Sequence, residues 1–179
     1  MGTGRLVRNT VWSRSSAGPN PKGWSSLAIE SFASVSNCPD DYPFPTPWRD
    51  AEHLNHWLRC PTAEVRGYHV LHDGSVVGYF LLSRVGGQTR IADIRISSGD
   101  PRNWAAAYRL ASRAAAELPE TCEVLAVAST PSANASLTSS GFRNRGSVPL
   151  FLYDPQKKLA GTPPMFWNMI DGDAAYLED

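Results

Sequence analysis

The sequence has few cysteines and no excess of charge of either sign. Its three cysteines, Cys38, Cys60 and Cys122, are scattered and form no Cys-x-x-Cys pair. This spacing argues against a disulfide framework and a structural zinc site. His53 and His56 have no carboxylate or cysteine at matching spacing, so no metal site is expected. A reducing compartment suits such a chain, and we expect a cytoplasmic protein.

The charges of the chain cancel. Lysine and arginine together number 17, aspartate and glutamate together number 17, and there is no basic run. This balance does not favour binding to nucleic acid or to an anionic membrane surface. No apolar stretch is long enough to span a bilayer, and the first residues lack the apolar centre of a signal peptide. We therefore expect neither nucleic acid nor a membrane as a partner.

The first third of the chain combines helical spacing with a proline-rich loop. Apolar residues at helical spacing predict helices over Gly23–Val35 and Trp48–Leu58. Thr46-Pro47 offers an N-cap and a first-turn proline for the second of these helices. The four prolines of residues 36–47 exclude regular structure there, so we expect a rigid loop between the two helices.

The middle of the chain shows the alternation of β-strands. Gly67–His72 and Val76–Val85 are expected to pair as a hairpin. The His-Asp-Gly-Ser sequence between them is a strong turn signal, because Asp-Gly suits a tight turn with positive φ. A third strand, Arg90–Ser97, follows after Gly86-Gly87 and completes an antiparallel meander.

The third strand leads into a long helix. Alternation along Arg90–Ser97 predicts that Asp93 points to the same side as Ile91. Asp100 is a good N-cap for the helix that continues to residue 118. A helix N-terminus after a tight loop offers backbone N–H groups and a positive dipole end to a phosphate. An ordinary βα unit that only packs a core has the same pattern.

The last part of the chain adds shorter elements. Glu123–Ala128 is an apolar strand, and the strand, helix, strand order predicts that it runs parallel to the third strand. A helix is expected from Thr130-Pro131 to Gly141, which would adopt a left-handed C-cap. Val148–Tyr153 and Met165–Ile170 are expected to be further strands.

Together these elements predict an α/β fold. The expected sheet has about six strands and is mixed, with an antiparallel meander joined to a parallel β-α-β crossover and with helices on its faces. We expect two parts in the chain. Residues 1–62 would form an N-terminal helical segment with the proline-rich loop, packed on a core domain of residues 63–179.

The order of these elements resembles that of the GNAT acyltransferase family, the acetyl-CoA-dependent N-acetyltransferases. The matching segments are GSVVGYFLL (74–82), RIADIRI (90–96), EVLAVAS (123–129) and Ser140-Gly141-Phe142. Two further segments, residues 47–61 and 163–173, are similar to a bacterial branch that includes proteins of cell-envelope and polysaccharide biosynthesis. The resemblance covers roughly residues 45–173 and implies a GNAT-like core.

The resemblance implies that acetyl-CoA or another acyl-CoA is the cofactor. In the family its pyrophosphate sits at the start of the third helix, on the pattern Q/R-x-x-G-x-G/A, which Arg102–Ala107 matches with alanine in place of the first glycine. Pro101 removes one N–H there, and Trp104 is bulky. The candidate cofactor-binding residues are Ile94, Ile96, Arg102, Asn103, Trp104, Ala105 and Ala107.

Acyl transfer to an amine needs a base, and a general acid can assist the departing thiolate. Asp93 is the candidate base, because family members often place an acid on this strand; the alternative is an ion pair with Arg95 or Arg90. Many family members carry a tyrosine acid where this sequence has Leu137. Tyr153 is the candidate substitute, unless it is an ordinary aromatic at a strand end.

The resemblance also places the end of the chain near the substrate cleft. Trp167, Asp171 and Asp173 are therefore candidates to bind a small-molecule amine or amino sugar, with a solvated tail as the alternative. The predicted function is the transfer of an acyl group from acyl-CoA to an amine by direct attack. The alternative is a non-catalytic GNAT-like binding or assembly module that has lost the cofactor loop, for which a homodimer is one arrangement.

Overall fold

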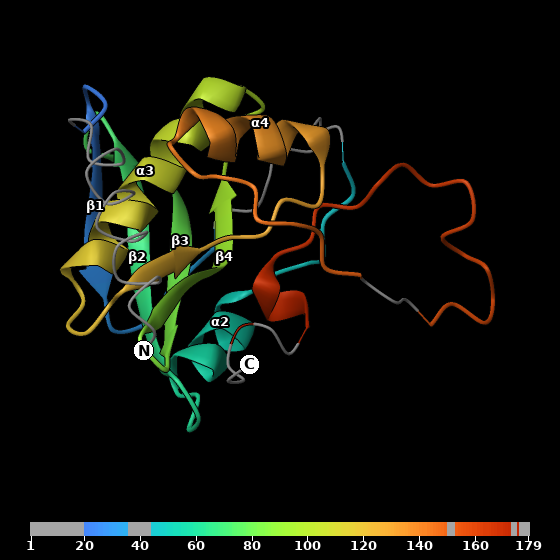
Figure 1. Ribbon diagram of the computed structural model, residues 1–179, viewed down its shortest axis with the longest axis horizontal. Helices are drawn as coiled ribbons and strands as arrows, with labels where there is room; N and C mark the ends of the chain where they lie inside the picture. Colours follow the sequence, from blue (N-terminus) through green and yellow to red (C-terminus); the bar gives the residue numbers. More distant parts are fainter. Residues whose placement is uncertain (1–19, 36–43, 150–152, 173–174, 176–179) are drawn as a thin grey trace.

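The computed structural model describes residues 20–35, 44–149, 153–172 and 175. Within them the chain forms one open five-stranded sheet, three α-helices and a 3-10 turn (Figure 1). The strands lie side by side in chain order: β1 (Trp24–Ile29), β2 (Glu64–His72), β3 (Ser75–Val85), β4 (Gln88–Ile96) and β5 (Glu123–Leu125). The other elements are α2 (Ala51–Leu58), α3 (Pro101–Glu117), α4 (Pro131–Ser139) and η1 (Met169–Asp171). Neighbours from β1 to β4 are antiparallel, and β5 is parallel to β4, which confirms an α/β fold with a mixed sheet.

Helices cover both faces of the sheet. On the α3 face, strand side chains pack against the alanine-rich side of α3 and against α4; they include Phe80, Leu82, Ile94 and Ile96. On the α2 face, the strands pack against α2 and η1 through Tyr79, Leu81, Ala92, Leu54 and Ile170. The sheet therefore has two separate apolar layers, one on each side.

The β2–β3 hairpin forms where the sequence predicts it. Asp73 and Gly74 have φ angles of 48° and 80°, the backbone that a tight hairpin turn of this twist requires. Gly86 and Gly87, with φ of 55° and 82°, make the next turn in the same way. The antiparallel meander of β2, β3 and β4 is confirmed.

The helix predicted over Gly23–Val35 is wrong. Its first half is β1, which pairs antiparallel with β2 from Trp24 opposite His72 to Ile29 opposite Gly67. The segment contains two adjacent serines and has a weak intrinsic preference for helix, so pairing with β2 decides its conformation. β1, which precedes residue 62, thus belongs to the same sheet as the strands that follow it.

The helix predicted over Trp48–Leu58 exists but begins later, at Ala51. Its N-cap is Asp50, whose side chain accepts a hydrogen bond from the His53 N–H at 2.7 Å. The cap predicted at Thr46-Pro47 is therefore wrong. Residues 45–50 have no regular structure and precede the helix as the proline-rich loop predicts.

The caps of α3 and α4 match the sequence more closely. Asp100 caps α3, accepting a hydrogen bond from the Arg102 N–H at 2.8 Å, and Thr130 caps α4. At the end of α4 the Phe142 N–H donates to the Leu137 carbonyl at 3.1 Å, and Gly141 has a φ of 96°. This is the left-handed C-cap that Gly141 predicts.

The end of the chain departs from the prediction. Residues 165–168 and η1 replace the strand expected at Met165–Ile170, and β5 ends at Leu125 rather than Ala128. Of the strand expected at Val148–Tyr153, residues 150–152 lie outside the described residues, and those on either side are not in a strand. The segment after α4 instead forms a long loop that extends away from the sheet (Figure 1). Among the described residues, no helix has the length and apolar character to cross a membrane.

Candidate functional site

The parallel strands β4 and β5 stay together for three residues only. Gln88, Thr89 and Arg90 pair with β5, whereas β4 continues to Ile96 without a paired strand on that side in the described chain. The Ser97 N–H donates to Val77 in β3 at 2.8 Å. Backbone groups alternate in direction along a strand, so those of Ile96 and Ile94 point away from β3. We call this side of β4, from residue 91 to 96, the open edge.

A β-bulge in β4 fixes which side chains surround the open edge. Leu81 of β3 pairs with Asp93 and Leu82 pairs with Ile91, so Ala92 has no partner residue in β3. The extra residue places Ala92 and Asp93 together on the α2 face, while Ile91 lies on the α3 face. The expectation that Asp93 and Ile91 share a side is therefore wrong, because a bulge interrupts the alternation.

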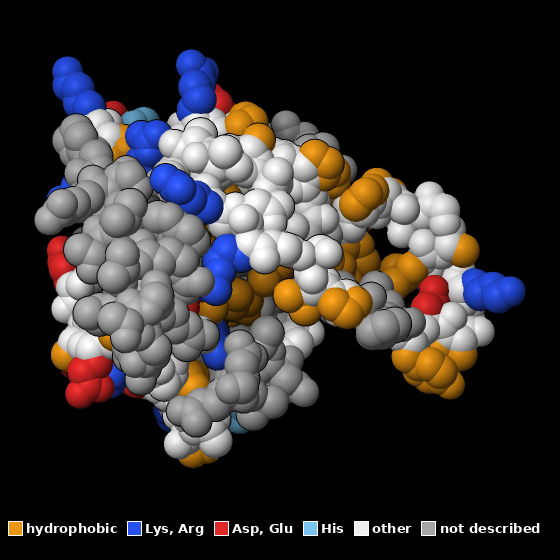
Figure 2. Space-filling view, in the orientation of Figure 1, with side chains coloured by type: hydrophobic (Ala, Val, Ile, Leu, Met, Phe, Trp, Pro, Cys, Tyr) orange, Lys and Arg blue, Asp and Glu red, His pale blue; other side chains and the backbone are white. Residues whose placement is uncertain are grey.

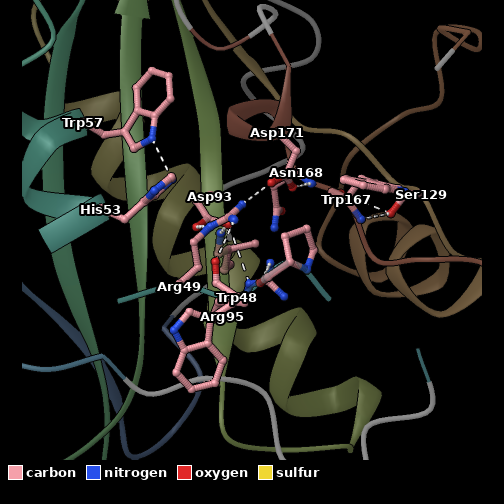
Figure 3. Close-up of polar contacts among 12 residues, drawn as sticks. Trp48, Arg49, His53, Trp57, Asp93, Arg95, Ser129, Trp167, Asn168 and Asp171 are labelled. Carbon is pink, nitrogen blue, oxygen red and sulfur yellow. Dashed lines mark hydrogen bonds and ion pairs between the residues drawn. The ribbon is translucent and has the colours of Figure 1, made fainter. Parts of the chain in front are cut away.

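Asp93 lies at the centre of a buried charged cluster on the α2 face (Figure 3). Its side chain is fully buried, and its Oδ2 accepts hydrogen bonds from Arg49 Nε and from the Tyr79 hydroxyl, both at 2.9 Å. Arg95 Nε lies 3.8 Å from the other oxygen. The ion pair with Arg95, stated above as the alternative to a base, is present. Both oxygens of this carboxylate already face cationic or hydroxyl partners, which favours the ion-pair interpretation over the role of base.

Arg49 joins three parts of the fold. Its guanidinium bonds to Asp93 in β4, to Asp171 in η1 and to the Trp48 carbonyl before α2 (Figure 3). Burial alone would lower the pKa of Arg49, but the adjacent Asp93 and Asp171 carboxylates raise it above its ordinary value. Burial, and then the negative charge of Asp93, raise the pKa of Tyr79 well above the usual value. Arg49 therefore stays charged, and the Tyr79 hydroxyl stays a donor.

The chain's own segment 165–168 lies beside the open edge. The Phe166 ring is fully buried, 5.1 Å from the Trp104 ring on the α3 face and 5.2 Å from the Arg95 guanidinium carbon on the α2 face. The Trp167 N–H donates to Ser129 Oγ at 2.7 Å, just beyond β5. Because Phe166 contacts side chains from both faces, it lies next to β4 where the two strands part.

Asn168 continues this segment toward the charged cluster. Its side chain is buried, and its backbone N–H donates to Asp171 Oδ2 at 2.9 Å. Asp171 thus links Asn168 to Arg49, and Figure 3 shows the Asn168 side chain on the side of this segment that faces the cluster. The amide nitrogen, Nδ2, has no hydrogen-bond partner among the described residues.

The start of α3 is occupied by its own cap. Besides the Arg102 N–H, the Asn103 and Trp104 N–H groups bond to the Asp100 backbone carbonyl, at 3.0 and 3.3 Å. The Arg102 guanidinium pairs with the Asp100 carboxylate at 2.8 Å, and this bond lowers the pKa of Asp100. Trp104 is buried and donates to the Ser98 carbonyl at 2.7 Å, so it belongs to the core.

A groove of about 650 Å³ lies beside this helix start, between α3 and α4. Its lining includes Arg102, Asn103, Ala105, Arg109, Ser136 and Ser139. Three of the residues expected at the cofactor pyrophosphate, Arg102, Asn103 and Ala105, therefore line one groove. Ala107 is fully buried under α3 and does not line it.

The remaining candidates are dispersed. Tyr153 is 93% exposed on the long loop, whose surface carries apolar side chains (Figure 2), and it is not part of the buried cluster. Leu137, at the family's tyrosine position, is buried in the core. Trp167 is half-buried and Asp171 is ion-paired with Arg49, whereas Asp173 lies outside the described residues.

Several residues of the site were missed in the sequence. Tyr79 lies opposite Arg95 in the β3–β4 hairpin, so the meander itself could have suggested that these two residues are neighbours. Arg49 and Asn168 come from distant segments, and no local pattern connects either of them with Asp93. Within the described ranges, no three histidine, cysteine, aspartate or glutamate side chains gather as a metal ion requires.

Comparisons of the chain with known protein families, with curated proteins and with solved structures found no match.

Proposed function

We propose that this chain is an N-acyltransferase with a GNAT-like fold that moves an acyl group from acyl-CoA to an amine. The observation that carries the proposal is the parting of β4 from β5 after three paired residues, which leaves the rest of β4 unpaired on that side in the described chain as it leads to α3. The sequence resemblance described above supports the same activity. Fold analogy does not identify the acceptor, which we propose to be a small amine or amino sugar bound beside Trp167.

The open edge of β4 suits the arm of acyl-CoA, which contains amide groups. The Ile94 N–H already donates to Asp93 Oδ1 at 3.1 Å, so the Ile94 carbonyl and the backbone groups of Ile96 are what this edge offers. An extended chain with amides can add to such an edge as a further strand does. The groove between α3 and α4 lies just beyond the end of β4. There Arg102 and Arg109 supply positive charge for the pyrophosphate.

Two contacts within the chain compete with this mode of binding. Phe166 lies beside the open edge, and Asp100 holds both Arg102 and the first N–H groups of α3. Acyl-CoA can bind as proposed only when Phe166 moves and Arg102 leaves Asp100. Only the fraction of molecules in which both contacts are broken can bind acyl-CoA, so the apparent affinity of the protein for acyl-CoA is reduced.

The reaction is a direct displacement. The amine nitrogen forms a bond to the thioester carbonyl carbon, and the carbon–sulfur bond breaks. The amine nitrogen loses one proton, and the sulfur of CoA gains one. Asp93 and Asp171 are both paired with Arg49, so neither is available to remove a proton. We infer that the acceptor enters as the neutral amine and that water carries the proton.

Calorimetric titration of acetyl-CoA into the purified protein tests this proposal. We expect micromolar binding that Arg109→Glu weakens by about tenfold, because a groove cation becomes an anion. The matched control is Arg113→Glu, the same charge change on an exposed part of α3 outside the groove. The absence of binding up to about 1 mM, in protein that is folded by circular dichroism, would overturn the proposal.

The second candidate is a non-catalytic module with the same fold. It is favoured because both places proposed for acyl-CoA are already occupied by the chain. Phe166 lies at the open edge, and Asp100 bonds the first N–H groups of α3. Titration of acetyl-CoA into Phe166→Ala distinguishes the two functions. If neither the wild type nor this variant binds acetyl-CoA, the non-catalytic module is the better description.

A further inference from the structure

The buried amide of Asn168 carries a donor without a hydrogen-bond partner in the described residues. The residue is 7% exposed, and its Nδ2 has no partner in the described residues. Buried donors are nearly always hydrogen-bonded in folded proteins, and an unpaired one destabilises the native state by about 1 to 3 kcal/mol. Such a group calls for an explanation, and a ligand that supplies the missing acceptor is one.

The backbone that carries this amide is held firmly. The Asn168 N–H bonds to Asp171, and Asp171 in turn is paired with Arg49. On the other side, the backbone of Trp167 is fixed by Ser129 Oγ. The amide therefore projects from a fixed point, as a group that receives a ligand oxygen must do.

The position of Asn168 connects the open edge with the charged cluster. Phe166, two residues earlier, contacts Arg95 beside β4, and Asn168 is joined to Arg49 through Asp171 (Figure 3). The Arg49 and Arg95 guanidinium groups here are balanced by the Asp93 and Asp171 carboxylates, so the amide is the donor that the cluster leaves for a ligand oxygen.

We propose that Asn168 Nδ2 donates a hydrogen bond to the carbonyl oxygen of the acyl group, which enters along the open edge. This inference rests on the proposed function. The oxygen becomes more negative when the amine adds to the carbonyl carbon. When the carbon–sulfur bond breaks, its electron pair re-forms the carbonyl double bond and the charge leaves on the sulfur of CoA. Asn168 thus stabilises the added state more than the thioester itself.

The proposal separates a binding role from a structural role. If the amide only supports the fold, its removal destabilises the free protein. If it awaits a ligand, Asn168→Leu lowers the urea midpoint much less than Asn55→Leu does, because the amide donor that it removes has no partner in the described part of the free protein. The same variant is expected to weaken acetyl-CoA binding by about tenfold.

The matched control is Asn55, whose amide is fully paired. Its Oδ1 accepts from the Phe32 N–H at 2.7 Å and its Nδ2 donates to the Phe32 carbonyl at 2.9 Å. Asn55→Leu is expected to lower the urea midpoint and to leave acetyl-CoA binding unchanged. A second variant, Asn168→Asp, keeps the side-chain carbonyl oxygen and replaces the amide donor with a second, charged oxygen, in case the leucine variant does not fold.

Carbon-13 NMR of acetyl-CoA labelled at the thioester carbonyl gives a readout that needs no acceptor amine. A hydrogen bond to the carbonyl oxygen moves this resonance downfield in the wild-type complex, and we expect Asn168→Leu and Asn168→Asp to abolish most of that shift. Equal shifts in wild type and variants would overturn the role of Asn168. A loss of stability in Asn168→Leu as large as that in Asn55→Leu would also overturn it. If the wild type does not bind acetyl-CoA, the proposed function itself fails.

Discussion

The two faces of the sheet are built in different ways. On the α3 face, Phe80, Leu82 and Ile94 meet the alanines of α3, and the layer is held by apolar packing. On the α2 face, one residue away along β4, Asp93 and Arg95 are buried with Arg49. The first layer depends on size and shape, whereas the second requires that every charged member be present.

This difference teaches where the fold tolerates change. Apolar contacts are non-directional, and swaps that conserve volume usually destabilise a core only slightly. A buried ion pair compensates a large desolvation penalty, so the loss of one partner leaves the other as an unpaired buried charge. Two adjacent residues of β4 should therefore respond very differently to equally small substitutions.

The first prediction compares these two neighbours directly. Asp93→Asn keeps the shape of the side chain but leaves Arg49 and Arg95 without their shared carboxylate. We expect it to lower the free energy of unfolding by about 3 to 5 kcal/mol. Ile94→Val removes one methylene from the other face and should lower it by about 1 kcal/mol. Urea unfolding followed by circular dichroism measures both, and equal losses would show that the faces do not differ in this way.

The second prediction concerns Phe166, which lies between the two faces at the open edge. Phe166→Ala should lower the free energy of unfolding by about 3 kcal/mol, because it leaves a cavity. The matched control is Phe32→Ala on the α2 face, where Phe32 packs edge-on against Tyr79 and away from the open edge.

The two phenylalanine variants should differ in ligand binding. Under the proposed function only Phe166→Ala tightens the binding of acetyl-CoA, since it removes a side chain that occupies the open edge. Calorimetric titration of both variants checks this. If Phe166→Ala binds acetyl-CoA no better than Phe32→Ala does, Phe166 does not compete with the ligand.

The same comparison explains how much could be predicted from sequence. The α3 face follows in part from local signals: the strand pattern of β2 and β3 and the Asp100 cap of α3 were sufficient. The β4 bulge at Ala92 could not be predicted, because it arises from the pairing with β3 and no pattern in the sequence of β4 alone indicates it. β1 was missed for a similar reason, since its partner β2 decides its conformation.

The candidate site was predictable only in part. Asp93 was recognised as important from its place on a strand, and its pairing with Arg95 follows from the same strand. Arg49 and Asn168 reach the cluster through tertiary contacts over long sequence separations, which periodicity cannot show. Arg102, Asn103 and Ala105 were candidates from the resemblance alone. The groove that they line, and the bonds by which Asp100 occupies the helix start, were visible only in the structure.

The last and smallest expected effect is a pH dependence on the α2 face. Tyr79 donates to Asp93 in a buried environment, and burial and this carboxylate raise its pKa well above the ordinary value of 10.0. Below pH 10 the phenol is protonated in both the folded and the unfolded chain. Above about pH 10 the unfolded chain loses the proton first. The unfolded state then gains stability relative to the folded state, so the free energy of unfolding falls as the pH rises.

Tyr79→Phe isolates this contribution. At neutral pH it should lower the free energy of unfolding by about 1.5 kcal/mol, because one hydrogen bond to the Asp93 carboxylate is lost. Between about pH 9.5 and 11 the wild type should lose stability more steeply than the variant, so that their urea midpoints converge. The exposed-tyrosine control, Tyr153→Phe, should follow the wild type. Parallel curves for wild type and Tyr79→Phe would mean that the phenol ionises equally in both states, and that the buried cluster does not hold its proton.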